Sequence, residues 1–118
     1  MSIKYFKEIG VRTHQGTELI DLTNEIDKLV KASGVEEGIC YLFVPHTTAG
    51  ITINENADPT VQDDMLIELN KIIPFSDGYR HMEGNSAAHI KSSLMGSSLT
   101  LIVTPAVVFG TQIRHTPS

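Results

Sequence analysis

The sequence is short of several residues and motifs, and each shortage excludes a class of protein. It has one cysteine, Cys40, so neither a disulfide within the chain nor a Cys-x-x-Cys zinc site is possible. Nine Lys and Arg stand against fourteen Asp and Glu, and this net charge of −5 provides no basic surface for a nucleic-acid backbone. Gly-x-Gly-x-x-Gly, Walker and Gly-x-Ser-x-Gly motifs are absent, so no nucleotide-binding fold or esterase elbow is predicted.

Long apolar segments are also missing. No run approaches the roughly 18 residues that cross a membrane, and residues 1–5 hold no signal-peptide core. We therefore expect a cytoplasmic protein that binds neither membrane nor nucleic acid. With 118 residues, of which 41% are hydrophobic, the chain suits one domain with an ordinary core, and we expect residues 1–118 to form it.

Hydrophobic patterning predicts short strands and three helices. The predicted strands span residues 2–12, 18–22, 38–45, 51–53, 98–104 and 106–109, and the predicted helices span residues 23–33, 59–73 and 86–95. The almost continuously apolar run 38–45 predicts a central strand buried on both faces, whereas the tail 111–118 shows no pattern. We expect an α+β fold: a single compact domain, with a mostly antiparallel sheet and about three helices packed on it.

Capping residues mark the ends of the predicted helices. Asp58 is expected to be the N-cap of the second helix, with Pro59 as its first residue. Gly34 and Gly96 are expected to end the first and third helices.

The densest polar stretch runs from His46 to Asp64, between the apolar run and the second helix. It contains one His, several hydroxyls, two Asn, one Glu and three Asp, which is more than a turn and a helix cap require. The candidate ligand-binding residues here are Thr47, Asn54, Glu55 and Asn56. The alternative is that these side chains shape the turn.

Three histidines occupy positions from which they could converge on one metal ion. His46 ends the apolar run, His81 lies in a polar loop and His89 lies in the third helix. Three neutral imidazoles with an open fourth position suit a catalytic metal, and Asp64 and Glu83 could orient them or act as acid and base. The alternative is three unrelated histidines that bond to the backbone. The remaining histidines are expected at the surface: His14 and His115.

A candidate anion site precedes the third helix. Residues Gly84, Asn85 and Ser86 lie where free N–H groups and the positive end of the helix dipole favour a phosphate. Lys91, in the same helix, either adds charge to this site or is a solvated surface lysine.

Several short motifs follow one another in order over roughly residues 1–104. They are His46-Thr47-Thr48-Ala49-Gly50, Asn54-Glu55-Asn56-Ala57-Asp58-Pro59, Asp63-Asp64-Met65, His81-x-Glu83-Gly84 and Ala88-His89-Ile90-Lys91-Ser92-Ser93-Leu94-x-Gly96-Ser97-Ser98. In this order they resemble the YjbQ family (UPF0047), small uncharacterised proteins also described as secondary thiamine-phosphate synthases.

The resemblance implies a compact α+β subunit in a homotrimer, with sites near subunit boundaries. It implies a divalent metal ion, zinc or magnesium, held by His46, His81 and His89, with acidic positions at Asp64 and Glu83. It also implies an activity that joins hydroxymethylpyrimidine diphosphate to thiazole phosphate and releases pyrophosphate. The metal and the helix N–H groups would stabilise the leaving pyrophosphate.

The C-terminal end departs from the family pattern. The family has Gly-Thr-Trp-Gln and then a further strand, whereas this chain has Gly110-Thr111-Gln112 and no Trp. We expect the final strand to be absent or altered, which would change the sheet edge and the trimer contact.

The leading functional hypothesis is a thiamine-phosphate synthase-like transferase. Two alternatives use the same pocket: a metal-dependent hydrolase of a phosphorylated metabolite, and a non-catalytic trimer that binds a small phosphorylated ligand.

Overall fold

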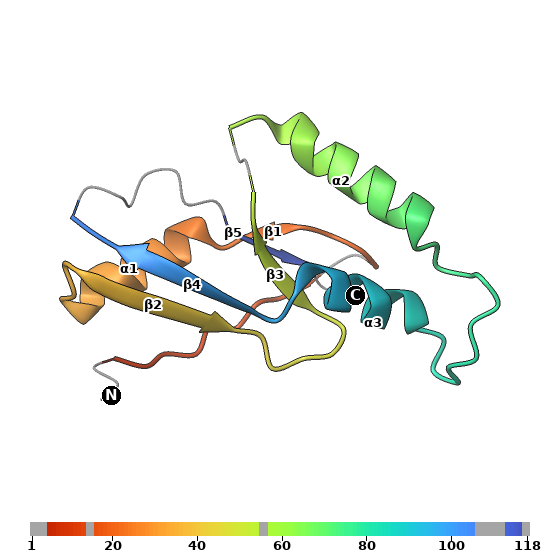
Figure 1. Ribbon diagram of the computed structural model, residues 1–118, viewed down its shortest axis with the longest axis horizontal. Helices are drawn as coiled ribbons and strands as arrows, with labels where there is room; N and C mark the ends of the chain where they lie inside the picture. Colours follow the sequence, from red (N-terminus) through yellow and green to blue (C-terminus); the bar gives the residue numbers. More distant parts are fainter. Residues whose placement is uncertain (1–4, 14–15, 55–56, 106–112, 117–118) are drawn as a thin grey trace.

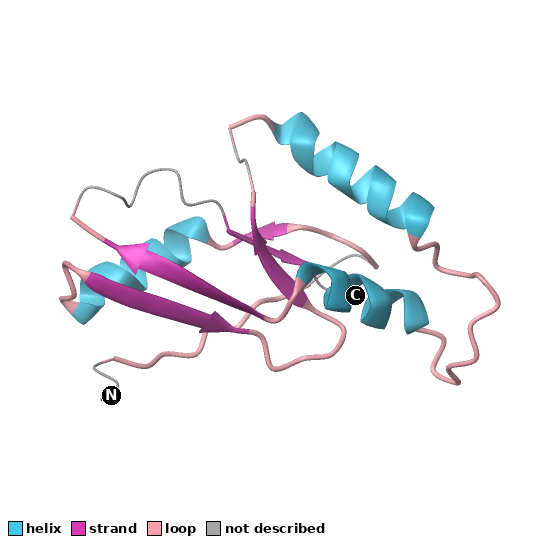
Figure 2. Cartoon of the chain, in the orientation of Figure 1, coloured by secondary structure: helices cyan, strands magenta, loops and turns pink. Residues whose placement is uncertain are grey.

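The computed structural model describes residues 5–13, 16–54, 57–105 and 113–116. Its elements, in chain order, are β1 (Ile20–Asp21), α1 (Thr23–Ser33), β2 (Gly38–Phe43), β3 (Gly50–Ile53), α2 (Pro59–Ile72), α3 (Ser86–Met95), β4 (Ser98–Val103) and β5 (Ile113–Thr116) (Figure 1). Three helices and antiparallel strands in one domain confirm the predicted α+β class (Figure 2). No described helix has both the length and the hydropathy needed to cross a membrane.

The strands form two small antiparallel sheets. β2 pairs with β4 in a register that runs from Gly38 opposite Val103 to Phe43 opposite Ser98. The second sheet has the order β1-β5-β3, so its central strand is the last one in the chain. The segment 96–97 joins the two sheets, because Ile51 N–H donates to the Gly96 carbonyl at 2.9 Å.

Local signals set the helix ends as predicted. The Asp58 carboxylate accepts a hydrogen bond from the Thr60 N–H at 2.9 Å, and Pro59 opens α2. Gly34 ends α1 in the left-handed conformation, at φ +74°, and Gly96 follows α3. The predicted spans of α1 and α3 match those observed.

The core lies between α1 and the inner face of the β2–β4 sheet, and it extends to β3. Its buried members are Leu22, Ile26, Val44, Ala49 and Ile51. Partly buried side chains from the N-terminal segment, α1, β2 and β4 complete it: Ile9, Val11, Ile20, Val30, Cys40, Leu42, Leu99 and Leu101. Each fully buried aliphatic side chain contributes about 1.5–3 kcal/mol, so this cluster is the main stabilising element of the fold.

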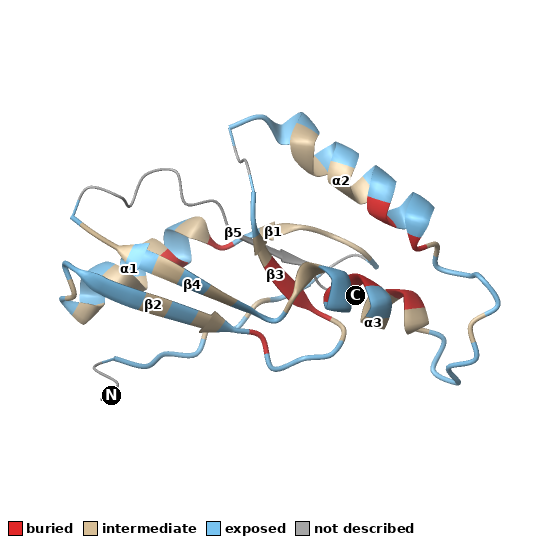
Figure 3. Cartoon of the chain, in the orientation of Figure 1, coloured by how far each residue is buried: buried red, intermediate tan, exposed pale blue. Residues whose placement is uncertain are grey.

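Three predicted strand features are wrong. Residues 5–12 form no strand. The apolar run is not buried on both faces, because α1 covers only one face of β2; Ile39, Tyr41 and Phe43 point to the other and are 55%, 61% and 70% exposed (Figure 3). The tail, in which no pattern was found, contains a strand, β5, so the final strand is not absent. The strand predicted at residues 106–109 lies outside the described residues.

Candidate functional site

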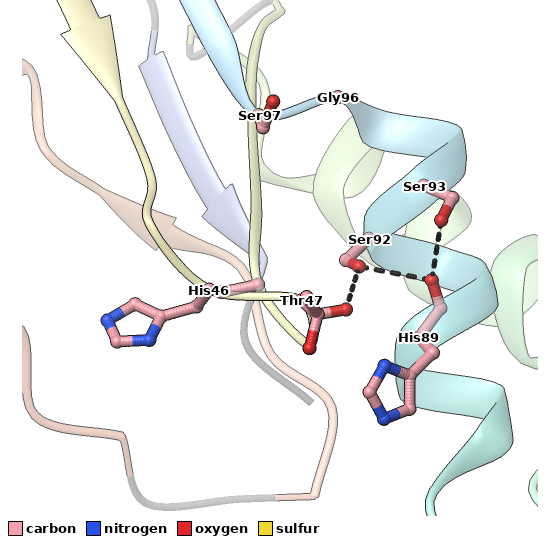
Figure 4. A pocket seen from close by; sticks show the side chains of 8 residues that line it. His46, Thr47, His89, Ser92, Ser93, Gly96 and Ser97 are labelled. Atoms are coloured by element: carbon pink, nitrogen blue, oxygen red, sulfur yellow. Dashed lines mark hydrogen bonds between the residues drawn. The ribbon is translucent and has the colours of Figure 1, made fainter.

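One face of α3 forms a wall of an open cavity. His89, Ser92, Ser93 and Gly96 recur at the helical spacing that places residues on one face. The opposite wall is the loop between β2 and β3. The cavity measures about 410 Å³ and is lined by His46, Thr47, Ala49, His89, Ser92, Ser93, Gly96 and Ser97 (Figure 4).

A close approach of backbones holds these walls together. A Cβ atom added at Gly50 would lie 2.9 Å from the Gly96 carbonyl oxygen, so only glycine lets β3 pass this near α3. Val44 N–H donates to the Ser97 carbonyl at 2.8 Å. The loop that carries His46 is therefore anchored to the end of α3 from both sides.

Two serines of α3 make hydrogen bonds at the cavity wall. The Ser92 hydroxyl, in a residue that is only 7% exposed, donates to the carbonyl oxygens of Thr47 at 2.5 Å and of His89 at 3.0 Å. The Ser93 hydroxyl donates to the His89 carbonyl at 2.9 Å. Ser92 thus ties the helix directly to the loop that forms the other wall.

The structure brings together three of the residues predicted for the metal site. The His81 and His89 rings meet edge-to-face with centroids 5.2 Å apart, and Glu83 Oε2 lies 3.9 Å from His81 Nε2. A turn shapes this loop, since the Gly84 N–H donates to the His81 carbonyl at 3.1 Å and Gly84 has φ +74°. His89 therefore belongs both to this cluster and to the cavity.

The other two predicted metal-site residues lie elsewhere. His46 lines the cavity, but its imidazole points away from α3, on the far side of Thr47 from His89 (Figure 4). Asp64 is exposed on α2 and does not line the cavity. Within the described part of the chain, no three His, Cys, Asp or Glu side chains are grouped so that they could hold a metal ion. The metal set His46, His81 and His89 stays a prediction.

The predicted phosphate residues at the start of α3 lie where the sequence places them. Ser86 is the first helical residue and Asn85 is the N-cap residue, without a side-chain bond to the helix. Asn85 Oδ1 is buried and finds no hydrogen-bond partner among the described residues. A buried carbonyl oxygen without a partner is costly, so this atom is suited to accept from a donor or to bind a cation.

Lys91 is not a solvated lysine. It is 4% exposed, and its ammonium donates to Asn70 Oδ1 at 2.6 Å and to Thr17 Oγ1 at 3.3 Å, away from the cavity lining. Burial lowers the pKa of Lys91.

The remaining predicted ligand residues come from the polar stretch. Thr47 lines the cavity, whereas Asn54 donates to Met65 Sδ at 3.2 Å. Glu55 and Asn56 lie outside the described residues.

The sequence analysis missed three serines that line the cavity: Ser92, Ser93 and Ser97. A usable signal was present for two of them, because Ser92 and Ser93 follow His89 by three and four residues and so share its helix face.

Comparison with known proteins identifies relatives over most of the chain. The family model described as UPF0047 protein YjbQ-like matches residues 7–112. UPF0047 protein MJ1081 of Methanocaldococcus jannaschii is 48% identical over 101 residues, which are 86% of this chain and 73% of that protein. UPF0047 protein YugU of Bacillus subtilis is 46% identical over 98 residues, 82% of this chain and 74% of that protein.

Solved structures of the family have the same fold. A crystal structure of an uncharacterized YjbQ/UPF0047 family protein from Clostridium acetobutylicum gives a TM-score of 0.84 at 47% identity, covering 91% of this chain and 85% of that one. A YbjQ-like protein of unknown function from Sulfolobus solfataricus gives 0.87 at 28% identity, covering 96% and 85%.

These relatives overturn the predicted reaction. They are described only as UPF0047 or uncharacterized proteins, or as a protein of unknown function, and none is described by a reaction. The prediction of a thiamine-phosphate synthase-like activity is therefore wrong on these comparisons.

Proposed function

We propose a ligand-binding function, argued from the site itself. The chain belongs to the UPF0047 YjbQ-like family, and none of the relatives named above is described by a reaction. The cavity between residues 44–49 and α3 binds a small phosphorylated ligand. A divalent metal ion binds next to it, at His81 and His89. His89 carries the proposal, because the same imidazole lines the cavity and pairs with His81.

The spacing of the two rings supports a shared metal ion. Two imidazoles on one tetrahedral ion, with metal–nitrogen distances of about 2.0–2.1 Å, have centroids about 5 Å apart. The His81 and His89 centroids are 5.2 Å apart, so rotation of one ring from its edge-to-face position would turn nitrogens of both toward one ion. Imidazole ligands favour zinc over magnesium, which prefers oxygen ligands, so zinc is the proposed ion. Glu83 lies beside His81, where its carboxylate would orient the ring.

The lining of the cavity supports an anionic ligand. It contains two imidazoles and several hydroxyls but no carboxylate, although the chain as a whole carries a net charge of −5. The volume of about 410 Å³ falls within the range of small-ligand pockets. A phosphate here would be bound by the imidazoles and by the hydroxyls of Thr47 and Ser97, and the adjacent metal ion would offset its charge.

A homotrimer is proposed as the assembled form, and the outer face of the β2–β4 sheet supports association between copies. This outer face carries Ile39, Tyr41, Phe43 and Ile102, all exposed, and its remaining positions are Thr100 and Ser98, so it bears no charge.

Calorimetric titration of three alanine variants tests the site. Zn²⁺ is titrated into phosphate-free protein, and inorganic pyrophosphate is titrated into metal-free protein in a separate experiment. His81→Ala should lose at least tenfold in Zn²⁺ affinity and keep its pyrophosphate affinity, whereas His89→Ala should weaken both.

His46→Ala is the matched comparison. It should weaken pyrophosphate binding and leave Zn²⁺ binding intact, because its ring points away from His89. Loss of Zn²⁺ binding in His46→Ala as well would place His46 among the ligands, as the sequence analysis predicts. Unchanged Zn²⁺ affinity in His89→Ala would overturn the metal site.

A further inference from the structure

The hydroxyl protons of Ser92 and Ser93 in α3 are donated to backbone carbonyl oxygens, and this determines which ligand groups these serines can bind. A serine hydroxyl has one proton to donate and lone pairs that accept. The Ser92 hydroxyl lies 2.5 Å from the Thr47 carbonyl oxygen and 3.0 Å from that of His89. Carbonyl oxygens only accept, so the single Ser92 proton is held between them. Because the residue is only 7% exposed, little else competes with these two acceptors for the proton.

Ser93 makes a similar hydrogen bond, although it is exposed. Its hydroxyl proton is donated to the His89 carbonyl oxygen at 2.9 Å, one turn back along the helix. Both serines line the cavity, and Figure 4 shows both hydroxyls bonded toward the backbone. While these bonds are kept, the two oxygens meet a ligand as acceptors.

We infer that the cavity selects a phosphate ester of a polyol or sugar, with the phosphate toward the imidazoles and the ligand's hydroxyl groups donating to Ser92 and Ser93. The inference rests on the proposed binding function and adds the chemical class of the ligand. A phosphate dianion only accepts hydrogen bonds, so it would be repelled by the two serine oxygens. It is instead accommodated beside the imidazoles and the Thr47 hydroxyl, which also line the cavity.

An alcohol fits the serine wall better than an ammonium group does. Both groups donate hydrogen bonds, but a buried cation also needs a negative partner. No carboxylate lines the cavity, so an ammonium group would meet only neutral oxygens and imidazoles. A neutral hydroxyl makes the same hydrogen bonds without that cost.

Two phosphate esters with the same three-carbon chain and the same charge test this inference. Glycerol 3-phosphate carries two hydroxyls, and n-propyl phosphate carries none. Calorimetric titration of the zinc-loaded full chain should give about tenfold tighter binding of glycerol 3-phosphate, as expected for one or two net hydrogen bonds. Phosphoethanolamine, with an ammonium group in place of the hydroxyls, should bind no better than n-propyl phosphate.

Variants then locate the preference. Ser93→Ala together with Ser92→Ala should remove most of the tenfold difference, and exposed Ser76→Ala, outside the cavity, should keep it. Circular dichroism checks folding, and if the double variant does not fold, Ser93→Ala alone should reduce the preference.

The outcomes separate this inference from the proposed function. Equal affinity for the two esters, or tightest binding of phosphoethanolamine, overturns the inference and leaves the proposed function standing. If no phosphate compound binds, the proposed function is overturned and the inference falls with it.

Discussion

Lys91 joins three parts of the chain through one buried ammonium group. It lies in α3, bonds to Asn70 of α2, and bonds to Thr17 ahead of β1. Because its partners are neutral, the charge is not compensated by them, which is why burial lowers the pKa of Lys91. At the scale of a single residue, burial of this ammonium group costs free energy, and its hydrogen bonds fix the position of the helix that carries His89.

Lys91→Met should show both the loss of these hydrogen bonds and the loss of the buried charge. It leaves Asn70 Oδ1 without its donor, so the free energy of unfolding should fall by about 1–3 kcal/mol at pH 7 in urea titrations. The lowered pKa means that the unfolded chain holds this proton more tightly than the folded chain does. The free energy of unfolding of the wild type should therefore rise with pH between the lowered folded pKa and the ordinary value near 10.4. Lys91→Met should lack this rise. Parallel pH profiles of the two proteins would contradict this account.

Gly50 is a residue whose missing side chain positions the cavity. Gly50→Ala would place a Cβ 2.7 Å from Met95 Cβ, and the backbone around Gly96 cannot yield without moving α3. The melting temperature should fall, corresponding to about 1–3 kcal/mol, and pyrophosphate affinity should fall with it. Gly10→Ala is the matched control, since a Cβ at Gly10 meets nothing within 4 Å. Similar losses in both variants would refute the steric explanation.

At the scale of elements, α2 depends strongly on its first turn. Leu69 is its only buried residue, and Ile67 and Ile72 are exposed, so packing holds the helix weakly. The Asp58 carboxylate accepts from both the N–H and the hydroxyl of Thr60, and these hydrogen bonds lower the pKa of Asp58. The charged form of this residue is therefore the one that stabilises the start of the helix.

An acid titration of two Asp58 variants tests this role. The stabilisation is present above the ordinary Asp pKa of about 3.9 and is lost as the pH falls through the lowered folded pKa. Asp58→Ala should lower the melting temperature at pH 7 and flatten its fall in acid. Asp58→Asn retains a capping acceptor, so it should be nearly as stable as wild type at pH 7 and lack that pH-dependent term. Equal melting temperatures for Asp58→Ala and wild type at pH 7 would show that the cap contributes nothing.

The helices were predictable because their signals are local, and the sheets were not. Asp58, Pro59 and the glycines that end helices act within one turn of the chain, whereas β5 gains its place only by pairing with β1 and β3. The site divides in the same way. His89 was found from its residue type and helix face. Its pairing with His81 depends on how the loop turns, which the sequence does not show. The Ser92 hydroxyl can donate to the Thr47 carbonyl oxygen only once the fold has brought the two together.

At the scale of the whole molecule, the outer face of the β2–β4 sheet is the feature that a single chain leaves unexplained. An apolar strand face without charge is a hazard for a protein that stays alone in solution. Since α1 buries the opposite face, no further element among the described residues is placed over Ile39, Tyr41 and Phe43, which remain exposed. Packing against other copies is the proposed solution, and it makes oligomerisation part of the stability of the chain.

Sedimentation velocity of two charge variants tests that solution. Wild type should sediment as a trimer, and Phe43→Glu should sediment mainly as a monomer, because a carboxylate buried in an apolar interface without a partner costs several kcal/mol. Ile67→Glu places the same charge on an exposed apolar position of α2, away from this face, and should leave the trimer intact. Because the trimer buries the apolar face, the melting temperature of wild type should also rise with protein concentration, and that of Phe43→Glu should not. A monomeric wild type, or a Phe43→Glu variant that still forms the trimer, would show that this face does not mediate assembly.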